Sequence, residues 1–118
     1  MERNEQLFRD VADAIEQHPE QYDQGVIEGE TACGTAYCIA GWAAFLRLGH
    51  AWQVTQVYCD LLGLEFREAW GYVKRTDTGG ERVVPGLFSS EWRPHDGLSV
   101  PDALRKIGEG AAIEDVSA

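Results

Sequence analysis

Two cysteines near the middle of the chain carry the clearest potential for chemistry. Cys33 and Cys38 stand five positions apart, and Gly34 and Thr35 follow Cys33 directly. A cysteine at the start of a helix is a candidate nucleophile, because the helix dipole favours the thiolate there. Cys33 is therefore the only candidate catalytic residue. A small thiol-dependent enzyme or redox protein that uses Cys33 or Cys38 is one functional hypothesis.

A catalytic thiol also needs a positioned base, and the sequence offers none in a clear context. Its three histidines are scattered over different predicted segments: His18, His50 and His95. A disulfide between Cys33 and Cys38 is geometrically conceivable. It is opposed by the reducing compartment that an odd number of cysteines and a polar N-terminus indicate. The pattern therefore favours a protein that is not an enzyme, with both cysteines in structural roles.

A structural zinc domain is the second alternative. Cys33 and Cys38 would need His50 and Cys59 to complete four ligands. The first pair has the spacing C-x4-C, whereas zinc sites commonly use C-x2-C, and a thiol among apolar residues usually behaves as a small hydrophobic side chain. We therefore expect no cofactor and no bound metal, and Cys33 and Cys38 remain only weak candidates for metal ligands.

Acidic side chains gather near the N-terminus. The chain has a net charge of −10, and residues 1–30 contribute −7 of it through nine acidic and two basic side chains. Asp10, Asp13 and Glu16 share the polar face of a predicted helix, where they form either a solvated surface or a docking surface for a basic partner. Such acidity argues against binding to nucleic acid or to anionic membranes. Mimicry of nucleic acid towards a DNA-binding protein is a special case of docking.

Trp92 and Arg93 are the second candidate for a binding surface. Both lie in an irregular segment that carries few other apolar residues. Tryptophan and arginine are enriched among the residues that dominate binding energy. If Trp92 is exposed, it is a recognition anchor.

Length and composition predict one domain over residues 1–118. A chain of 118 residues with 44% apolar residues can bury a single core without disulfides or metals. No apolar run approaches the roughly 20 residues of a membrane helix, and Met1–Gln6 lack the apolar segment of a secretory signal. We expect a cytoplasmic protein with a protein partner and no membrane association. The oligomeric state stays open.

Apolar spacing predicts a mostly α fold, a small bundle of about five helices with one short β-hairpin near residues 72–84. The first helix is expected over residues 5–17, with Asn4 as its N-cap and Pro19 ending it. The later helices are expected over residues 54–62, 64–70 and from Ser99 to Gly108 or Gly110. Residues 111–118 are expected to be a frayed tail in which Ile113 and Val116 are candidates for docking.

The central helix is expected over residues 36–48. Thr35 is its predicted N-cap, and Gly49 supplies the left-handed residue that ends it. Nearly every position in between is apolar, which predicts a helix that is buried on all sides and surrounded by the others.

Four segments form a recognisable order along the chain: His18-Pro19-Glu20, C-G-T-x-x-C-I-A-G-W over residues 33–42, Leu62-Gly63-Leu64, and Leu87-Phe88 followed by Trp92. Together they resemble a family of small uncharacterised proteins encoded by actinobacteria and their phages. The resemblance implies a small, mostly helical cytoplasmic protein, often of phage origin. It carries over no activity and no catalytic residue. The stretch from Tyr72 to Val84 is longer than the family pattern, as though a hairpin were inserted.

These observations lead to one main hypothesis. The protein is a non-enzymatic interaction protein, plausibly phage-encoded, that binds and modulates a host or partner protein through an acidic or aromatic surface. In that case it acts in the host cytoplasm.

Overall fold

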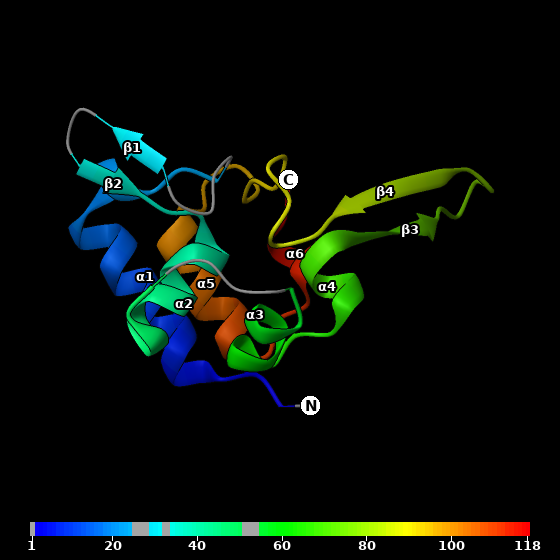
Figure 1. Cartoon of the computed structure of the whole chain (residues 1–118). Helices are drawn as coiled ribbons and strands as arrows, with labels where there is room; N and C mark the ends of the chain where they lie inside the picture. The colour runs from blue at the N-terminus through cyan, green and yellow to red at the C-terminus, as the bar shows by residue number, and fades with distance from the viewer. Residues whose placement is uncertain (1, 25–28, 32–33, 51–54) are drawn as a thin grey trace.

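The computed structural model describes residues 2–24, 29–31, 34–50 and 55–118, with only the backbone described for 29–31, 34–36 and 55. This part of the chain is mostly α-helical and contains two short antiparallel hairpins (Figure 1). Its elements are α1 (Glu5–Gln17), the 3-10 turn η1 (Pro19–Gln21), β1 (Gly29–Thr31), β2 (Gly34–Ala36), α2 (Ile39–Leu48), α3 (Thr55–Leu62), α4 (Phe66–Trp70), β3 (Gly71–Arg75), β4 (Glu81–Pro85), α5 (Val100–Gly108) and α6 (Ile113–Val116). The predicted fold class is confirmed.

Helix α1 forms as the sequence predicts. The Asn4 side chain accepts a hydrogen bond from the backbone N–H of Leu7 at 3.1 Å, which satisfies one of the free donors of the first turn. The helix ends at Gln17, ahead of Pro19. Its apolar stripe is buried, with Leu7, Phe8, Val11, Ala12 and Ile15 all at most 4% exposed.

The centre of the bundle is α1 rather than the predicted α2. Helix α1 contacts α5 most extensively and also packs on α2 and α3. Gly108 of α5 makes this approach possible, because a Cβ added there would come 2.8 Å from the Cβ of Phe8. Helix α5 is capped as expected, since the Ser99 hydroxyl accepts a hydrogen bond from Asp102 N–H at 3.2 Å.

Helix α2 begins at Ile39, later than predicted. Residues 34–36 form β2 and pair with β1, so Thr35 lies opposite Glu30 and is not the N-cap. The N-cap is Cys38. The prediction failed because strand pairing with the segment just before it outweighed the capping signal of Thr35. The last turn of α2 is also not buried: Phe45, Leu46 and Leu48 are 39–42% exposed. Gly49 ends the helix with a φ of +82°, as predicted.

The C-terminal residues are ordered, so the prediction of a frayed tail is wrong. Residues 113–116 form α6, in which Ile113 and Val116 are 2% and 3% exposed. The His95 N–H donates to Val116 O at 3.0 Å, and the Ala118 N–H donates to Arg93 O at 2.9 Å. These long-range bonds, together with the docking of Ile113 and Val116, hold the segment in place.

Strands β3 and β4 form the second hairpin, residues 71–85, which we call the arm. The arm projects away from the helices, which we call the body, and gives the molecule its longest dimension of 46 Å (Figure 1). Its register pairs Tyr72 with Val84, Val73 with Val83, and Lys74 with Arg82. Within the described residues, no helix combines the length and apolarity needed to cross a membrane.

Candidate functional site

The structure describes Cys38 and Cys59 but not Cys33, so it bears on only some of the cysteine predictions. Cys33, the candidate nucleophile, lies outside the described residues. Cys38 is 3% exposed, and its Sγ accepts a hydrogen bond from the Gly41 N–H at 3.4 Å. Burial raises the pKa of the Cys38 thiol, which leaves it protonated at neutral pH. Burial also raises the pKa of Cys59. Neither described thiol has the environment of a nucleophile.

The weak metal prediction finds no support in the described part of the chain. There, no group of three or more His, Cys, Asp or Glu side chains could hold a metal ion. Cys38 therefore has no described set of co-ligands. Its candidate partner Cys33 falls among the undescribed residues.

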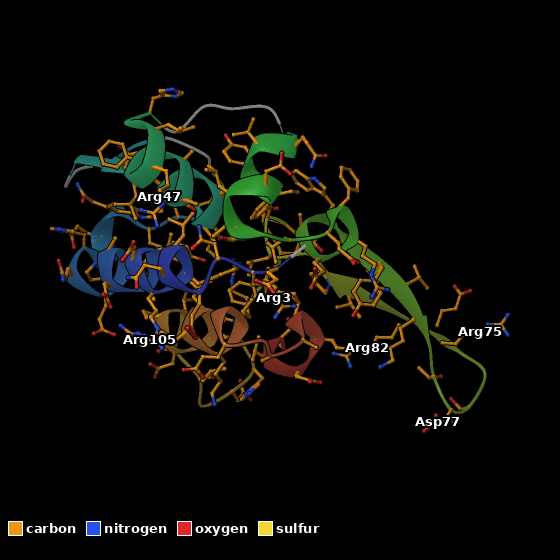
Figure 2. All side chains as sticks on the ribbon, turned by 90° about the horizontal axis from the view of Figure 1, so that it is seen from below. Arg3, Arg47, Arg75, Asp77, Arg82 and Arg105 are labelled. Carbon is orange, nitrogen blue, oxygen red and sulfur yellow. The ribbon has the colours of Figure 1, made fainter. Side chains whose placement is uncertain are left out.

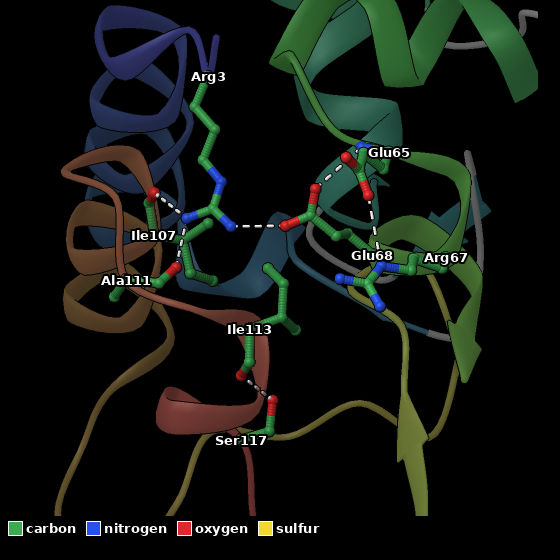
Figure 3. A network of polar contacts seen from close by, with 8 residues as sticks. All are labelled: Arg3, Glu65, Arg67, Glu68, Ile107, Ala111, Ile113 and Ser117. Carbon is green, nitrogen blue, oxygen red and sulfur yellow. Dashed lines mark hydrogen bonds and ion pairs between the residues drawn. The ribbon is translucent and has the colours of Figure 1, made fainter. Parts of the chain in front are cut away.

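Trp92 is not a surface anchor, because it is 0% exposed. Its indole N–H donates to the hydroxyl of Ser117 at 2.9 Å, and that hydroxyl donates to Ile113 O (Figure 3). The ring is covered because the C-terminal segment folds back over it. Arg93 is exposed, and its guanidinium donates to Ser90 O and Trp92 O, within its own loop.

Asp13 and Glu16 of α1 are exposed and Asp10 is partly exposed, but all three carboxylates are already paired. Arg105 of α5 lies 2.8 Å from Asp13 and 3.0 Å from Glu16, and Arg47 of α2 lies 3.4 Å from Asp10. Hydrogen bonds with Asp13 and then Glu16 raise the pKa of Arg105. These carboxylates therefore contribute to helix–helix contacts, and they are not a bare acidic patch.

A network around Arg3, which the sequence reading missed, fixes the base of the arm (Figure 3). The Arg3 guanidinium donates to Glu68 Oε2 at 2.6 Å, to Ile107 O at 2.8 Å and to Ala111 O. Burial alone would raise the pKa of Glu68, but hydrogen bonds from Glu65 N–H and Arg3 hold it below its usual value. Arg3 thus joins the N-terminus, α4 and the end of α5.

The arm grows directly out of α4 and is anchored there on both sides. Strand β3 starts at Gly71, immediately after α4 ends. Beyond β4, the N–H of Leu87 donates to Glu68 O at 2.9 Å, and the N–H of Phe88 donates to Ala69 O at 2.8 Å. Gly86 permits this fit, because a Cβ there would lie 2.3 Å from Ala69 O. The projecting strands therefore start from a fixed base.

One face of the arm is turned towards α6. Val84 is 0% exposed on this face, and Lys74 Nζ lies 2.9 Å from Glu114 Oε2. Arg82 makes a long contact of 3.5 Å with Ala118 O. The hydrogen bond with Glu114 raises the pKa of Lys74 and correspondingly lowers that of Glu114. This inner face is thus held by both apolar and charged contacts.

The outer face of the arm is apolar and open. Val73 and Val83 face each other across the hairpin and are 59% and 71% exposed. Trp70, at the base, is 43% exposed and packs edge-to-face on Phe88 with ring centroids 5.9 Å apart. A shallow hollow of about 360 Å³ is lined by these three exposed side chains together with Gly71, Tyr72, Val84, Pro85, Ser89 and Glu91. Exposed apolar clusters of this kind mark binding surfaces.

The arm as a whole carries a small positive charge in an otherwise acidic chain. Residues 71–85 carry three basic and two acidic side chains, against a net charge of −10 for the whole chain. A second hollow of about 240 Å³ is lined by Lys74, Arg75, Thr76, Asp77 and Arg82. Arg75 and Asp77 lie at the end far from the body (Figure 2). The open apolar face and this basic hollow make the arm the candidate functional site.

The residue pattern of the two strands could have indicated this site from the sequence. The two β-prone runs and the turn between them predicted the hairpin, but not a role for it in binding. In each strand a valine stands next to a basic residue, Val73-Lys74 in one and Arg82-Val83 in the other. Because successive side chains point to opposite faces, Val73 and Val83 share one face with Arg75, and Lys74 and Arg82 share the other.

Comparisons with protein-family models, with curated proteins and with solved structures found no match to this chain. Functional inference therefore depends on the geometry of the arm itself.

Proposed function

We propose that this is a non-enzymatic interaction protein that binds a partner protein through the outer face of the arm. The observation that carries the proposal is the pair Val73 and Val83, 59% and 71% exposed beside the half-exposed Trp70. Burying a valine fully is worth roughly 1.5–3 kcal/mol relative to leaving it in water. In the isolated chain this free energy is not gained, because both valines stay in water. A partner that buries them would bind more tightly by part of that amount.

The architecture suits recognition of a surface. A projecting hairpin reaches a partner without a clash from the body, and Trp70 supplies a large, fixed side chain of the type that dominates interface energies. The acidic face of α1 is a weaker candidate, because Asp13 and Glu16 already contact Arg105. This site thus replaces the acidic and Trp92 surfaces inferred from sequence.

The resemblance of the cysteine block to proteins of actinobacteria and their phages favours a phage-encoded protein. Its action would then be to bind and modulate a host protein in the host cytoplasm.

Affinity capture with paired variants tests this proposal. In the first, Val73→Asp/Val83→Asp, two charges occupy the outer face. The matched control, Asp13→Asn/Glu16→Gln, also changes two exposed side chains but lies on α1. The partner retained by the unchanged protein should be lost from the first variant and kept by the second, while circular dichroism shows both to be folded. The opposite pattern would place the interface on α1 and overturn the proposal.

A further inference from the structure

The backbone of the arm has an open edge on β3. Thr76 N–H donates to Gly80 O at 2.9 Å, so the antiparallel alternation makes Lys74–Arg82 a hydrogen-bonded pair and Val73–Val83 a non-hydrogen-bonded pair. The N–H and C=O groups of Val73 and Arg75 therefore point away from β4. In the described part of the chain these groups have no backbone partner. A row of such groups is a template for another strand.

Side-chain charge distinguishes the two edges of the arm. Strand β3 carries Lys74 and Arg75, and Arg75 has no ion pair among the described residues. Strand β4 carries Glu81 at its start and ends at Pro85, which has no N–H to offer. An acidic segment is thus attracted to the β3 edge and finds a poorer template on β4.

The two faces of the arm specify what such a segment must carry. Side chains of an added strand alternate between the faces of the sheet. Those on the outer face would lie beside Val73 near the base, where apolar groups are favoured, and beside Arg75 nearer the tip, where the guanidinium attracts the acidic residues of the segment. Those on the inner face would lie beside Lys74, whose side chain is 54% exposed despite its contact with Glu114. The basic hollow of about 240 Å³ gives their carboxylates space.

We propose that the open edge of β3 binds an extended segment of a partner protein in which apolar and acidic residues alternate, and that this segment becomes the third strand of the sheet. The inference deepens the proposed function and depends on the arm being the interface. A second copy of this chain is a poorer occupant, because pairing of β3 with β3 would bring Lys74 and Arg75 close to their counterparts, and like charges across strands repel.

The test uses a nine-residue peptide of alternating valine and glutamate, with a fluorescent label, and the same peptide with lysine in place of glutamate. Val73→Pro removes the outward N–H of β3 but no bond of the hairpin, because Val73 is in a non-hydrogen-bonded pair. Val83→Pro makes the same change on β4 and is the matched control. Affinity for the glutamate peptide should fall at least tenfold in Val73→Pro and less than twofold in Val83→Pro. The lysine peptide should not bind.

Arg75→Glu provides a second variant that leaves every backbone bond in place, and it should weaken binding of the glutamate peptide at least fivefold. Equal binding of the two peptides, equal losses in the two proline variants, or unchanged binding in Arg75→Glu would each overturn the inference. Dimerisation of the unchanged protein that disappears in Val73→Pro would also overturn it, in favour of a second copy. These outcomes are separable from the proposed function, which fails only if Val73→Asp/Val83→Asp keeps its partner.

Discussion

The body and the arm use the same kinds of residue in opposite ways. In the body, apolar side chains of α1 and α5 are buried against each other, and Arg105 contacts three carboxylates, those of Asp13, Glu16 and Asp102. In the arm, two valines face solvent, and Arg75 has no ion pair among the described residues. The contact between α1 and α5 therefore satisfies these side chains within the chain, whereas the arm keeps apolar and basic groups available.

The largest expected difference between the two regions concerns tryptophan. Trp92→Ala should lower the free energy of unfolding by about 3–5 kcal/mol, because it removes a fully buried ring from the core. Trp70→Ala, at the base of the arm, should cost only about 1 kcal/mol, since that ring is 43% exposed. Urea unfolding followed by circular dichroism measures both. Similar losses in the two variants would mean that the arm base is part of the core.

The second expected effect tests how firmly the arm is attached. Arg3→Ala should lower the free energy of unfolding by about 2 kcal/mol, because it removes a charged hydrogen bond to Glu68 and the hydrogen bonds that Arg3 donates to the carbonyls of Ile107 and Ala111. It should also broaden the amide resonances of residues 71–75 in NMR spectra. Lys106→Ala, an exposed change on α5, serves as the control. Unchanged resonances in Arg3→Ala would show that α4 holds the arm alone.

The same network predicts a pH dependence. Because the folded-state pKa of Glu68 lies below its usual value, the stability that it contributes is present above the ordinary carboxyl pKa of about 4.3. That contribution is lost as the pH falls through the lower folded value. Unfolding experiments between neutral and acidic pH should therefore show a smaller acid-induced loss in Arg3→Ala than in the unchanged protein. An identical acid profile in both proteins would show that Arg3 does not lower the pKa of Glu68.

Local signals explain which parts of the fold could be predicted. Asn4 and Ser99 cap helices whose apolar stripes are complete within a few turns, so α1 and α5 were predicted with nearly correct starts. Thr35 also looks like a cap, but it pairs with Glu30 in the β1–β2 hairpin. The burial of Trp92 depends on Ser117, 25 positions away. Errors thus arose where strand pairing or a distant contact, rather than a helix signal, decided the outcome.

The candidate site was harder to predict than the fold for the same reason. The two β-prone runs and the turn between them indicate a hairpin, yet they do not say which face stays open. Contacts of Lys74 with Glu114 and of Arg82 with the chain end choose that face. These contacts show which face of the arm is covered. The exposure of Val73 and Val83 on the other face then indicates a binding surface.

The buried thiols should react more slowly than a thiol placed on the arm. In a Cys33→Ser background, Cys38 and Cys59 should react with iodoacetamide at neutral pH at less than a tenth of the rate of a free cysteine, because burial blocks access and raises both pKa values. A cysteine placed on the arm by Val83→Cys should react at close to the free rate. Mass spectrometry of the labelled peptides measures each site. Rapid labelling of Cys38 would revive the thiol-enzyme hypothesis.

The smallest expected effect compares two arginines. Arg105→Ala should lower the free energy of unfolding by at most about 1 kcal/mol, because water screens its exposed ion pairs with Asp13 and Glu16, and about 0.5 M salt should reduce that loss. Arg75→Ala should leave stability unchanged at low salt and at about 0.5 M salt, because its guanidinium makes no ion pair with a described residue. Yet only Arg75→Ala should weaken binding of the glutamate peptide. A loss of stability in Arg75→Ala would mean that Arg75 already makes a stabilising contact within the chain. Pairing with Arg75 would then add little to the affinity of an acidic partner.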